Sequence, residues 1–171
     1  SALTTGLALA EGKALALIGI VPEYAETGYG YIERGEPIAS RVGGFTVKSF
    51  REKPDRATAE EYVRSGRFLW NSGIFVWRVD VLLDEMSRNL KSSVDQLRDA
   101  MRSADGGLAV DAVYKGLAKI SIDHAVLESS QRVQVVAADI GWQDVGNWEA
   151  LSRGFAPDAR SEEHTSELQS H

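Results

Sequence analysis

The sequence predicts an α/β fold built on a mixed sheet. Two apolar runs, 14–20 and 133–138, are typical of buried strands, and segments with helical periodicity lie between them. The runs 26–33 and 45–54 instead show alternation, the first of small with aromatic residues and the second at period two, which favours an antiparallel insertion around residues 28–50. Alternation of strands and helices around such an insertion indicates one α/β domain.

Glycine and proline bound the elements of the first half. An Ala- and Leu-rich helix is expected over 2–11, before the strand at 14–20. Extended segments are expected at 26–33 and 45–54, with a turn at 34–37 after the first of them.

The second half alternates helices with extended structure. A helix over 55–66, with Thr58 as its N-cap, precedes the extended run 68–77. Residues 103–107 have the composition of a loop. The remaining helices are expected at 81–86 with Asp80 as cap, at 93–101, at 122–129 with Ser121 as cap, and from near Trp148 onward.

Composition argues against several classes of function. The net charge is −6, with acidic and basic residues mixed along the chain, which disfavours a track for nucleic-acid phosphates. No apolar run approaches the roughly 20 residues of a membrane span. The sequence has no cysteine, so thiolate ligands and disulfides are excluded. We expect a cytoplasmic protein with neither a nucleic-acid nor a membrane partner.

Both ends of the chain look non-native. Residues 160–171 show no apolar periodicity and no capping pattern, and they look like the translation of a sequencing-adapter oligonucleotide. At the other end, Ser1 enters directly into helix-like sequence. We therefore expect a partial domain over 1–159, an artefactual tail over 160–171, and a native protein that extends beyond both ends.

Polar residues interrupt apolar surroundings at four places. In Gly28-Tyr29-Gly30, two glycines would let backbone amides and carbonyls face a ligand, although a β-bulge explains the same pattern. In Glu52-Lys53, the carboxylate suits sugar hydroxyls and the ammonium suits a phosphate, although a surface charge pair is the alternative.

The other two places carry an amide and a carboxylate. Asn71 offers donors and acceptors that suit vicinal hydroxyls, and the alternatives are a strand bulge or a core asparagine whose hydrogen bonds are satisfied within the protein. Asp144 lies in a glycine-bracketed turn after a buried strand, where it can hold a metal ion or cap a helix. Asp123 suits the dipole of a helix without any ligand, and His124 has no second ligand at metal-binding spacing.

The order and spacing of the motifs together are specific. They are Gly-Ile-Val-Pro at 19–22, Glu-Thr-Gly-Tyr-Gly-Tyr-Ile at 26–32, Phe-Arg-Glu-Lys-Pro at 50–54, Trp-Asn-Ser-Gly-Ile-Phe at 70–75, Ser-Ile-Asp at 121–123 and Gly-Trp-Gln-Asp-Val-Gly-Asn-Trp at 141–148. Over residues 1–155 this series closely resembles the mannose-1-phosphate guanylyltransferase family, also called GDP-mannose pyrophosphorylases.

The resemblance implies that the chain is the C-terminal part of a Rossmann-like nucleotidyltransferase domain. The implied reaction transfers a guanylyl group from GTP to mannose 1-phosphate and gives GDP-mannose and pyrophosphate. The family's glycine-rich GTP-binding signature and a further metal-binding aspartate are expected before Ser1. The fragment alone is therefore expected to be inactive.

The resemblance also implies roles for individual residues. Lys53 would contact the phosphate that joins sugar to nucleotide, and Asp144 would be one ligand of a Mg²⁺ cofactor. Positioning and charge neutralisation would then supply the catalysis, without a protein nucleophile. The residues implied to bind the sugar phosphate are Gly28, Tyr29, Gly30, Glu52, Lys53 and Asn71.

Two other functions stay open at this point. One is a hexose-1-phosphate nucleotidyltransferase with another sugar or base, and the other is a non-catalytic regulatory subunit that binds a sugar nucleotide. GTP and mannose 1-phosphate are the expected partners, and a homodimer is the candidate assembly. The sequence does not decide whether the parent carries a C-terminal β-helix or an isomerase domain.

Overall fold

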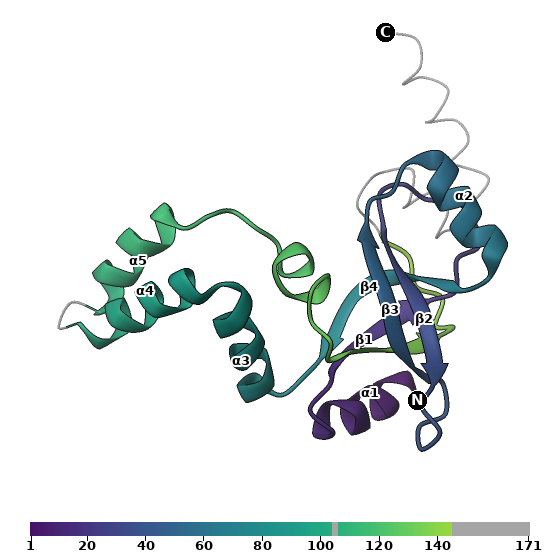
Figure 1. Cartoon of the computed structure of the whole chain (residues 1–171), viewed down its shortest axis with the longest axis horizontal. Coiled ribbons are helices and arrows are strands. Elements are labelled where there is room, and N and C mark those ends of the chain that lie inside the picture. Colours follow the sequence, from purple (N-terminus) through teal and green to yellow (C-terminus); the bar gives the residue numbers. More distant parts are fainter. Residues whose placement is uncertain (104–105, 145–171) are drawn as a thin grey trace, which may run out of the picture. The chain divides into compact units, whose positions relative to one another are not determined.

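The computed structural model describes residues 1–103 and 106–144 of the chain, which divides into two compact units, Ser1–Asp139 and Ile140–His171. All the helices and strands described below belong to the first unit (Figure 1). In chain order they are α1 (Ala2–Glu11), β1 (Leu15–Ile20), β2 (Gly30–Pro37), β3 (Gly44–Glu52), α2 (Arg56–Ser65), β4 (Phe68–Val76), α3 (Val79–Asn89), α4 (Lys91–Arg102), α5 (Gly106–Gly116), the π-helical turn η1 (Asp123–Leu127) and β5 (Val133–Ala138).

The strands form a mixed sheet that closes into a barrel in the order β1-β4-β2-β3-β5. β1 and β5 are parallel, whereas the other neighbouring strands are antiparallel. The prediction of a mixed sheet with an antiparallel insertion is thereby confirmed. β3 closes the barrel, because its first residues, Gly44–Thr46, pair with β5 while the strand also pairs with β2.

The core of this unit is built on β1. All six residues of β1 are buried, as its continuous apolar run predicts. Side chains from β4, β5 and the η1 turn pack against it, and α1 contacts both β1 and β5. The buried members of this core are Leu15, Leu17, Ile32, Phe50, Leu69, Val81, Ala125, Val126, Leu127, Val133 and Val135.

The turn expected at 34–37 is wrong, because β2 continues through it to Pro37. The ladder between β2 and β3 shifts register twice in this stretch, and Glu36 N donates to Thr46 Oγ1 at 2.9 Å. These irregularities accommodate the turn-like residues within the strand. The chain reverses later, at 38–43.

Two helix caps also differ from the expectation. The N-cap of α2 is Asp55, whose side chain accepts from the Thr58 N–H at 2.9 Å, so Thr58 lies inside the helix. Asp80 lies in the first turn of α3 and accepts from Arg78 at 2.9 Å instead of capping the helix. In both places more than one polar residue lies near the helix start, and side-chain type alone does not select the cap.

Helix α5 is a helix that the sequence did not predict. It begins within the expected loop 103–107, at two glycines that are weak helix formers, and it packs against α4. The helix expected over 122–129 is shorter and is the π-type turn η1. The helix expected from Trp148 lies outside the described residues. Within the described ranges, no helix has the length and apolar character that a membrane crossing requires.

The cap of α2 leads to a prediction about pH. The pKa of Asp55 is lowered, chiefly because the backbone and side chain of Thr58 donate to its carboxylate. The charged cap therefore stabilises the fold above the ordinary pKa of 3.8, and this contribution is lost as the pH falls through the lowered, folded-state value. We expect Asp55→Ala to reduce the free energy of unfolding at neutral pH, by an amount that shrinks in acid.

Urea unfolding at a series of pH values measures this effect. Asp55→Asn is the matched control, because asparagine caps a helix as well as aspartate but does not titrate. A loss for Asp55→Ala that stays constant down to the most acidic pH would contradict the prediction.

Candidate functional site

Three strands bring Gly30, Glu52 and Asn71 together. Gly30 faces Glu52 across the β2–β3 ladder, and β4 pairs with β2 immediately beside it, Trp70 opposite Tyr31. A Cβ atom on Gly30 would lie 2.5 Å from Glu52 Oε2 and 3.2 Å from Asn71 Cβ. The absence of a side chain at Gly30 therefore lets the Glu52 carboxylate and Asn71 both lie close to the backbone of β2.

Lys53 lies beside Glu52, although neighbouring strand residues normally point to opposite faces. Its backbone is left-handed, with φ 46°, and its N–H donates to Tyr29 O at 3.2 Å. Because the chain leaves β3 here, Lys53 Nζ lies 3.3 Å from Glu52 Oε1. The lysine side chain is 65% exposed and the glutamate side chain only 17%, so an anion arriving from solvent would meet the ammonium first.

The charge pair that the sequence offered as an alternative for Glu52 and Lys53 is present. The lysine end of this pair is exposed to solvent, so the pair contributes little to stability. A left-handed backbone at a non-glycine residue is unfavourable and is found preferentially at functional sites. Lys13, which is not among the predicted site residues, also has a positive φ of 66°, so the backbone of Lys53 does not by itself mark a functional residue.

A bulge in β4 holds Asn71. The β1–β4 ladder shifts register here, and Gly73 has φ 71°. Ser72 Oγ donates to Ile18 O at 2.7 Å, which ties the bulge to β1. Asn71 Oδ1 accepts from the Gly73 N–H at 3.2 Å. The strand bulge that the sequence left open is therefore present, and it orients the amide.

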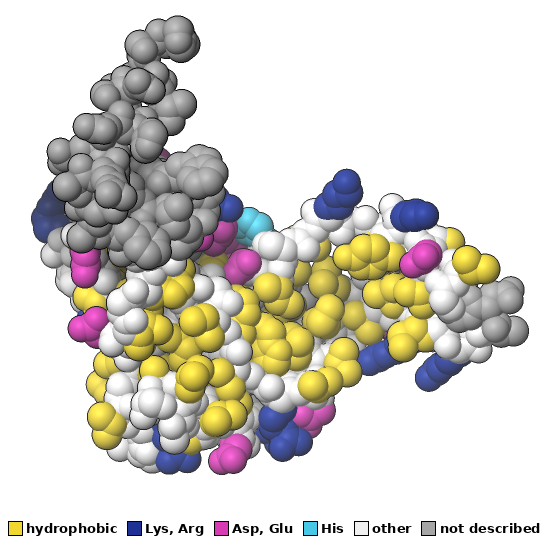
Figure 2. All heavy atoms as spheres, turned by 180° about the vertical axis from the view of Figure 1, so that it is seen from behind, with side chains coloured by type: hydrophobic (Ala, Val, Ile, Leu, Met, Phe, Trp, Pro, Cys, Tyr) yellow, Lys and Arg dark blue, Asp and Glu magenta, His cyan; other side chains and the backbone are white. Residues whose placement is uncertain are grey.

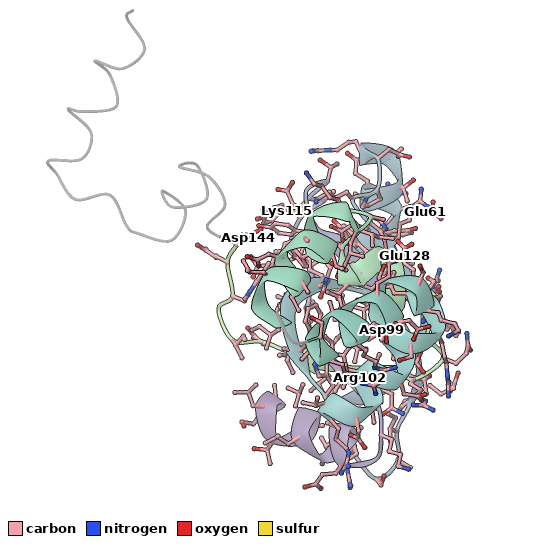
Figure 3. All side chains as sticks on the ribbon, turned by 90° about the vertical axis from the view of Figure 1, so that its left-hand side faces the viewer. Glu61, Asp99, Arg102, Lys115, Glu128 and Asp144 are labelled. Atoms are coloured by element: carbon pink, nitrogen blue, oxygen red, sulfur yellow. The ribbon has the colours of Figure 1, made fainter. Side chains whose placement is uncertain are left out.

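Asp123 contacts this amide and is a residue whose part in the site the sequence reasoning missed. Asn71 Nδ2 donates to Asp123 Oδ1 at 3.1 Å. The two residues are far apart in the chain, and no spacing pattern relates them. Asp123 does lie in the first turn of η1 as expected, and the neighbouring His124 pairs with Glu128 at 3.1 Å. Glu128, which follows η1 directly, is labelled in Figure 3.

An aromatic cluster lies next to these groups. Trp70 is 4% exposed, and its ring meets the edges of Tyr24 and Tyr29 with centroid distances of 4.8 and 5.2 Å. Within the described part of the chain, the buried Trp70 Nε1 has no hydrogen-bond partner. Tyr29 therefore contacts Trp70 through its ring and Lys53 through its backbone carbonyl.

Of the other predicted site residues, Gly28 lies outside this group, and Asp144 belongs to the second unit. Gly28 is exposed, and its N–H donates to Glu26 Oε1 at 3.0 Å. Asp144 is exposed and is the last described residue, at the start of the second unit (Figure 3). No group of three or more His, Cys, Asp or Glu side chains suited to a metal ion occurs in ranges 1–103 and 106–144. The assignment of Asp144 as a metal ligand stays a prediction.

A cavity of about 840 Å³ lies elsewhere in the first unit. Residues of α3, α4, α5 and the segment 117–121 line it, and no predicted site residue is among them. Figure 2 shows hydrophobic side chains along this helical part of the surface, where Met101, Leu108 and Tyr114 are exposed. The cavity therefore does not belong to the group around Gly30.

Comparison with known proteins identifies what the chain is similar to. The nucleotidyl transferase family model matches residues 2–161. Mannose-1-phosphate guanylyltransferase 2 of Escherichia coli O157:H7 is 41% identical over 154 residues, and mannose-1-phosphate guanylyltransferase of E. coli K12 is 38% identical over 157 residues. These matches cover 82% and 88% of this chain, but only 31% and 33% of the relatives' own length.

Two solved structures are also similar. A protein of Thermus thermophilus described as a mannose-1-phosphate geranyltransferase has a TM-score of 0.77 and 38% identity, over 92% of this chain and 44% of that one. A mannose-6-phosphate isomerase of Helicobacter pylori has a TM-score of 0.70 and 28% identity, over 84% of this chain and 57% of that one.

The close approach at Gly30 leads to a second prediction. We expect Gly30→Ala to displace the Glu52 carboxylate, because the new Cβ would lie 2.5 Å from its Oε2 atom. The closest clash is with the end of a flexible side chain, but Asn71 Cβ and Phe50 Cζ at 3.2 Å must also give way, so the loss in free energy of unfolding should be about 1–3 kcal/mol. A crystal structure of the variant and urea unfolding measure the two effects.

Gly28→Ala is the matched control within the same motif. A Cβ at Gly28 would meet its nearest atom, Glu26 Oε1, at an ordinary 3.4 Å. This variant should leave Glu52 where it is. An unmoved Glu52 carboxylate in Gly30→Ala would show that the prediction is wrong.

Proposed function

This chain belongs to the nucleotidyl transferase family, and on that premise we propose that it supplies the sugar-phosphate-binding part of a mannose-1-phosphate guanylyltransferase. The parent enzyme would transfer a guanylyl group from GTP to mannose 1-phosphate and release pyrophosphate. The convergence of Gly30, Glu52 and Asn71 from three strands is the observation that carries the proposal. The names of the similar proteins support the choice of sugar phosphate. We further propose that the described barrel is the C-terminal part of a Rossmann-like domain.

The polar groups around Gly30 suit a hexose. A carboxylate only accepts hydrogen bonds, and an amide both donates and accepts, so Glu52 and Asn71 together can match neighbouring hydroxyl groups. Glu52 and Asn71 both lie close to Gly30, so a sugar that contacts the two polar groups would also approach the backbone of this glycine. In this arrangement Glu52 would accept from mannose hydroxyls and Asn71 would contact further hydroxyls.

Charge at the site suits a phosphate beside the sugar. The exposed Lys53 ammonium would act as a point charge toward the phosphate that joins sugar and nucleotide. Tyr29 and Gly30 would then lie along the sugar, with Gly28 at the exposed end of the same segment. Since Lys53 N–H donates to Tyr29 O, the phosphate and sugar contacts are coupled through one backbone hydrogen bond.

The reaction needs positioned charges but no protein nucleophile. An oxygen of the sugar phosphate would bond to the α-phosphorus of GTP, and the bond from that phosphorus to the bridging oxygen would break. The electron pair would leave with pyrophosphate. Glu52, Asn71 and Lys53 would hold the attacking group in line, which is a major source of rate enhancement in such reactions.

We also propose Asp144 as one ligand of Mg²⁺. A single carboxylate is a chemically suitable donor, because Mg²⁺ prefers oxygen ligands, keeps several waters and takes further ligands from substrate phosphates. The bound ion would neutralise charge on phosphate oxygens. The homodimer and the cytoplasmic location stay predictions from the amino-acid sequence.

A substrate panel on the uninterrupted reading frame that contains this chain tests the function. We expect pyrophosphate release with GTP and mannose 1-phosphate, and kcat/KM values at least about tenfold lower for other nucleotides or hexose 1-phosphates. Higher activity with another pair would favour the alternative nucleotidyltransferase. Tight binding of sugar nucleotide without turnover would favour the regulatory subunit.

Two substitutions in that enzyme separate binding from turnover. Glu52→Gln should mainly raise KM for mannose 1-phosphate, because the amide keeps the size of the side chain but weakens acceptance from hydroxyls. Asp144→Ala should mainly lower kcat. Steady-state kinetics with each substrate varied in turn measure both effects, and unchanged constants for both variants would remove these assignments.

A further inference from the structure

We propose that Asp123 is a positioning residue that sets the orientation of the Asn71 amide and thereby the selection of substrate hydroxyls. The proposal rests on the proposed function of the site around Gly30. Asp123 belongs to η1 and not to the strands that carry Gly30, Glu52 and Asn71. Its hydrogen bond to Asn71 connects it to the site.

The two partners of the Asn71 amide fix which way it faces. The Gly73 N–H can only donate, so it requires the amide oxygen, and the distance is 3.2 Å. The Asp123 carboxylate only accepts, so it requires the amide nitrogen, and the distance is 3.1 Å. A reversed amide would place two donors together on one side and two acceptors together on the other. Both contacts therefore select the same orientation.

The fixed amide retains capacity for a ligand. Its nitrogen has a second hydrogen and its oxygen a second lone pair after the two observed bonds are counted. Asn71 lies beside Gly30, since a Cβ there would be 3.2 Å from Asn71 Cβ, and Glu52 lies beside the same glycine. A substrate that presents one accepting and one donating hydroxyl fits this amide, and one that lacks either hydroxyl leaves a polar group unmatched.

Asp123 has a rigid support. Asp123 is the first residue of η1. Three later residues of the same turn, Ala125, Val126 and Leu127, lie in the core and are at most 7% exposed. Glu128 N donates to Asp123 O at 3.0 Å, and Ala125 N donates to Ser121 O at 3.0 Å. The carboxylate is therefore held by core packing on one element, while the amide is held by the bulge of β4 on another.

A double-mutant cycle in the complete enzyme tests the proposal. We expect Asp123→Ala to raise KM for the sugar 1-phosphate about tenfold, since a charge-assisted hydrogen bond is lost. KM for the nucleotide should change less than about twofold, because the amide does not contact that substrate in the proposed arrangement. In an Asn71→Ala background, Asp123→Ala should add almost nothing, because the amide that it positions is gone.

Controls separate positioning from a general structural role. Asp123→Asn should restore most of the affinity, because an amide oxygen at position 123 can still accept from Asn71. Glu128→Gln alters the other acidic group of the same turn, which pairs with His124, and should leave both KM values unchanged. If Asp123→Ala does not fold, Asp123→Leu provides a variant that keeps the volume but cannot accept.

The outcomes separate this proposal from the proposed function. Additive effects of Asp123→Ala and Asn71→Ala in an active enzyme would overturn the positioning role alone. Equal increases of both KM values would do the same, since they would indicate a general loss of structure. An unmutated enzyme with no transfer to any sugar phosphate would overturn the proposed function and this inference with it.

Discussion

The pairing of β2 with both β3 and β4 is the constraint on which the candidate site depends. Gly30 begins β2, Glu52 ends β3, and Asn71 lies in β4, so the three residues meet only if these strands are neighbours. The barrel provides this arrangement because β2 lies between the two strands. The lack of a side chain at Gly30 then allows close approach. A change of register in either ladder would separate the groups, since a shift by one residue sends each side chain to the other face.

Local patterns were sufficient to predict much of the fold. The continuous apolar run predicts strand β1, and the Ala- and Leu-rich segment predicts helix α1, without reference to any other part of the chain. The bounds of both elements are close to those expected. The turn expected at 34–37 failed because glycine and proline also occur in bulged strands, and only pairing with β3 distinguishes the two. Helix α5 was missed because its first residues are glycines, and its support comes from packing against α4.

In the candidate site, too, the residues that could not be predicted are those whose contacts depend on tertiary packing. Gly28, Tyr29, Gly30, Glu52, Lys53 and Asn71 were each singled out, because polar residues in apolar strands are conspicuous in a sequence. Asp123 was not assigned to the site, since a carboxylate at a helix start has an ordinary explanation that needs no partner. Its bond to Asn71 depends on how η1 packs into the core, which periodicity and spacing do not reveal.

The left-handed backbone of Lys53 has a consequence for how this segment can change during evolution. Glycine would relieve the backbone there but would remove the cation, whereas arginine would keep a cation together with the same unfavourable conformation. Stability and charge therefore cannot be improved together by a single substitution at this position. Under the proposed role of Lys53 in phosphate binding, this position represents a trade-off between backbone stability and charge, and variants selected for heat resistance alone would tend to lose the lysine.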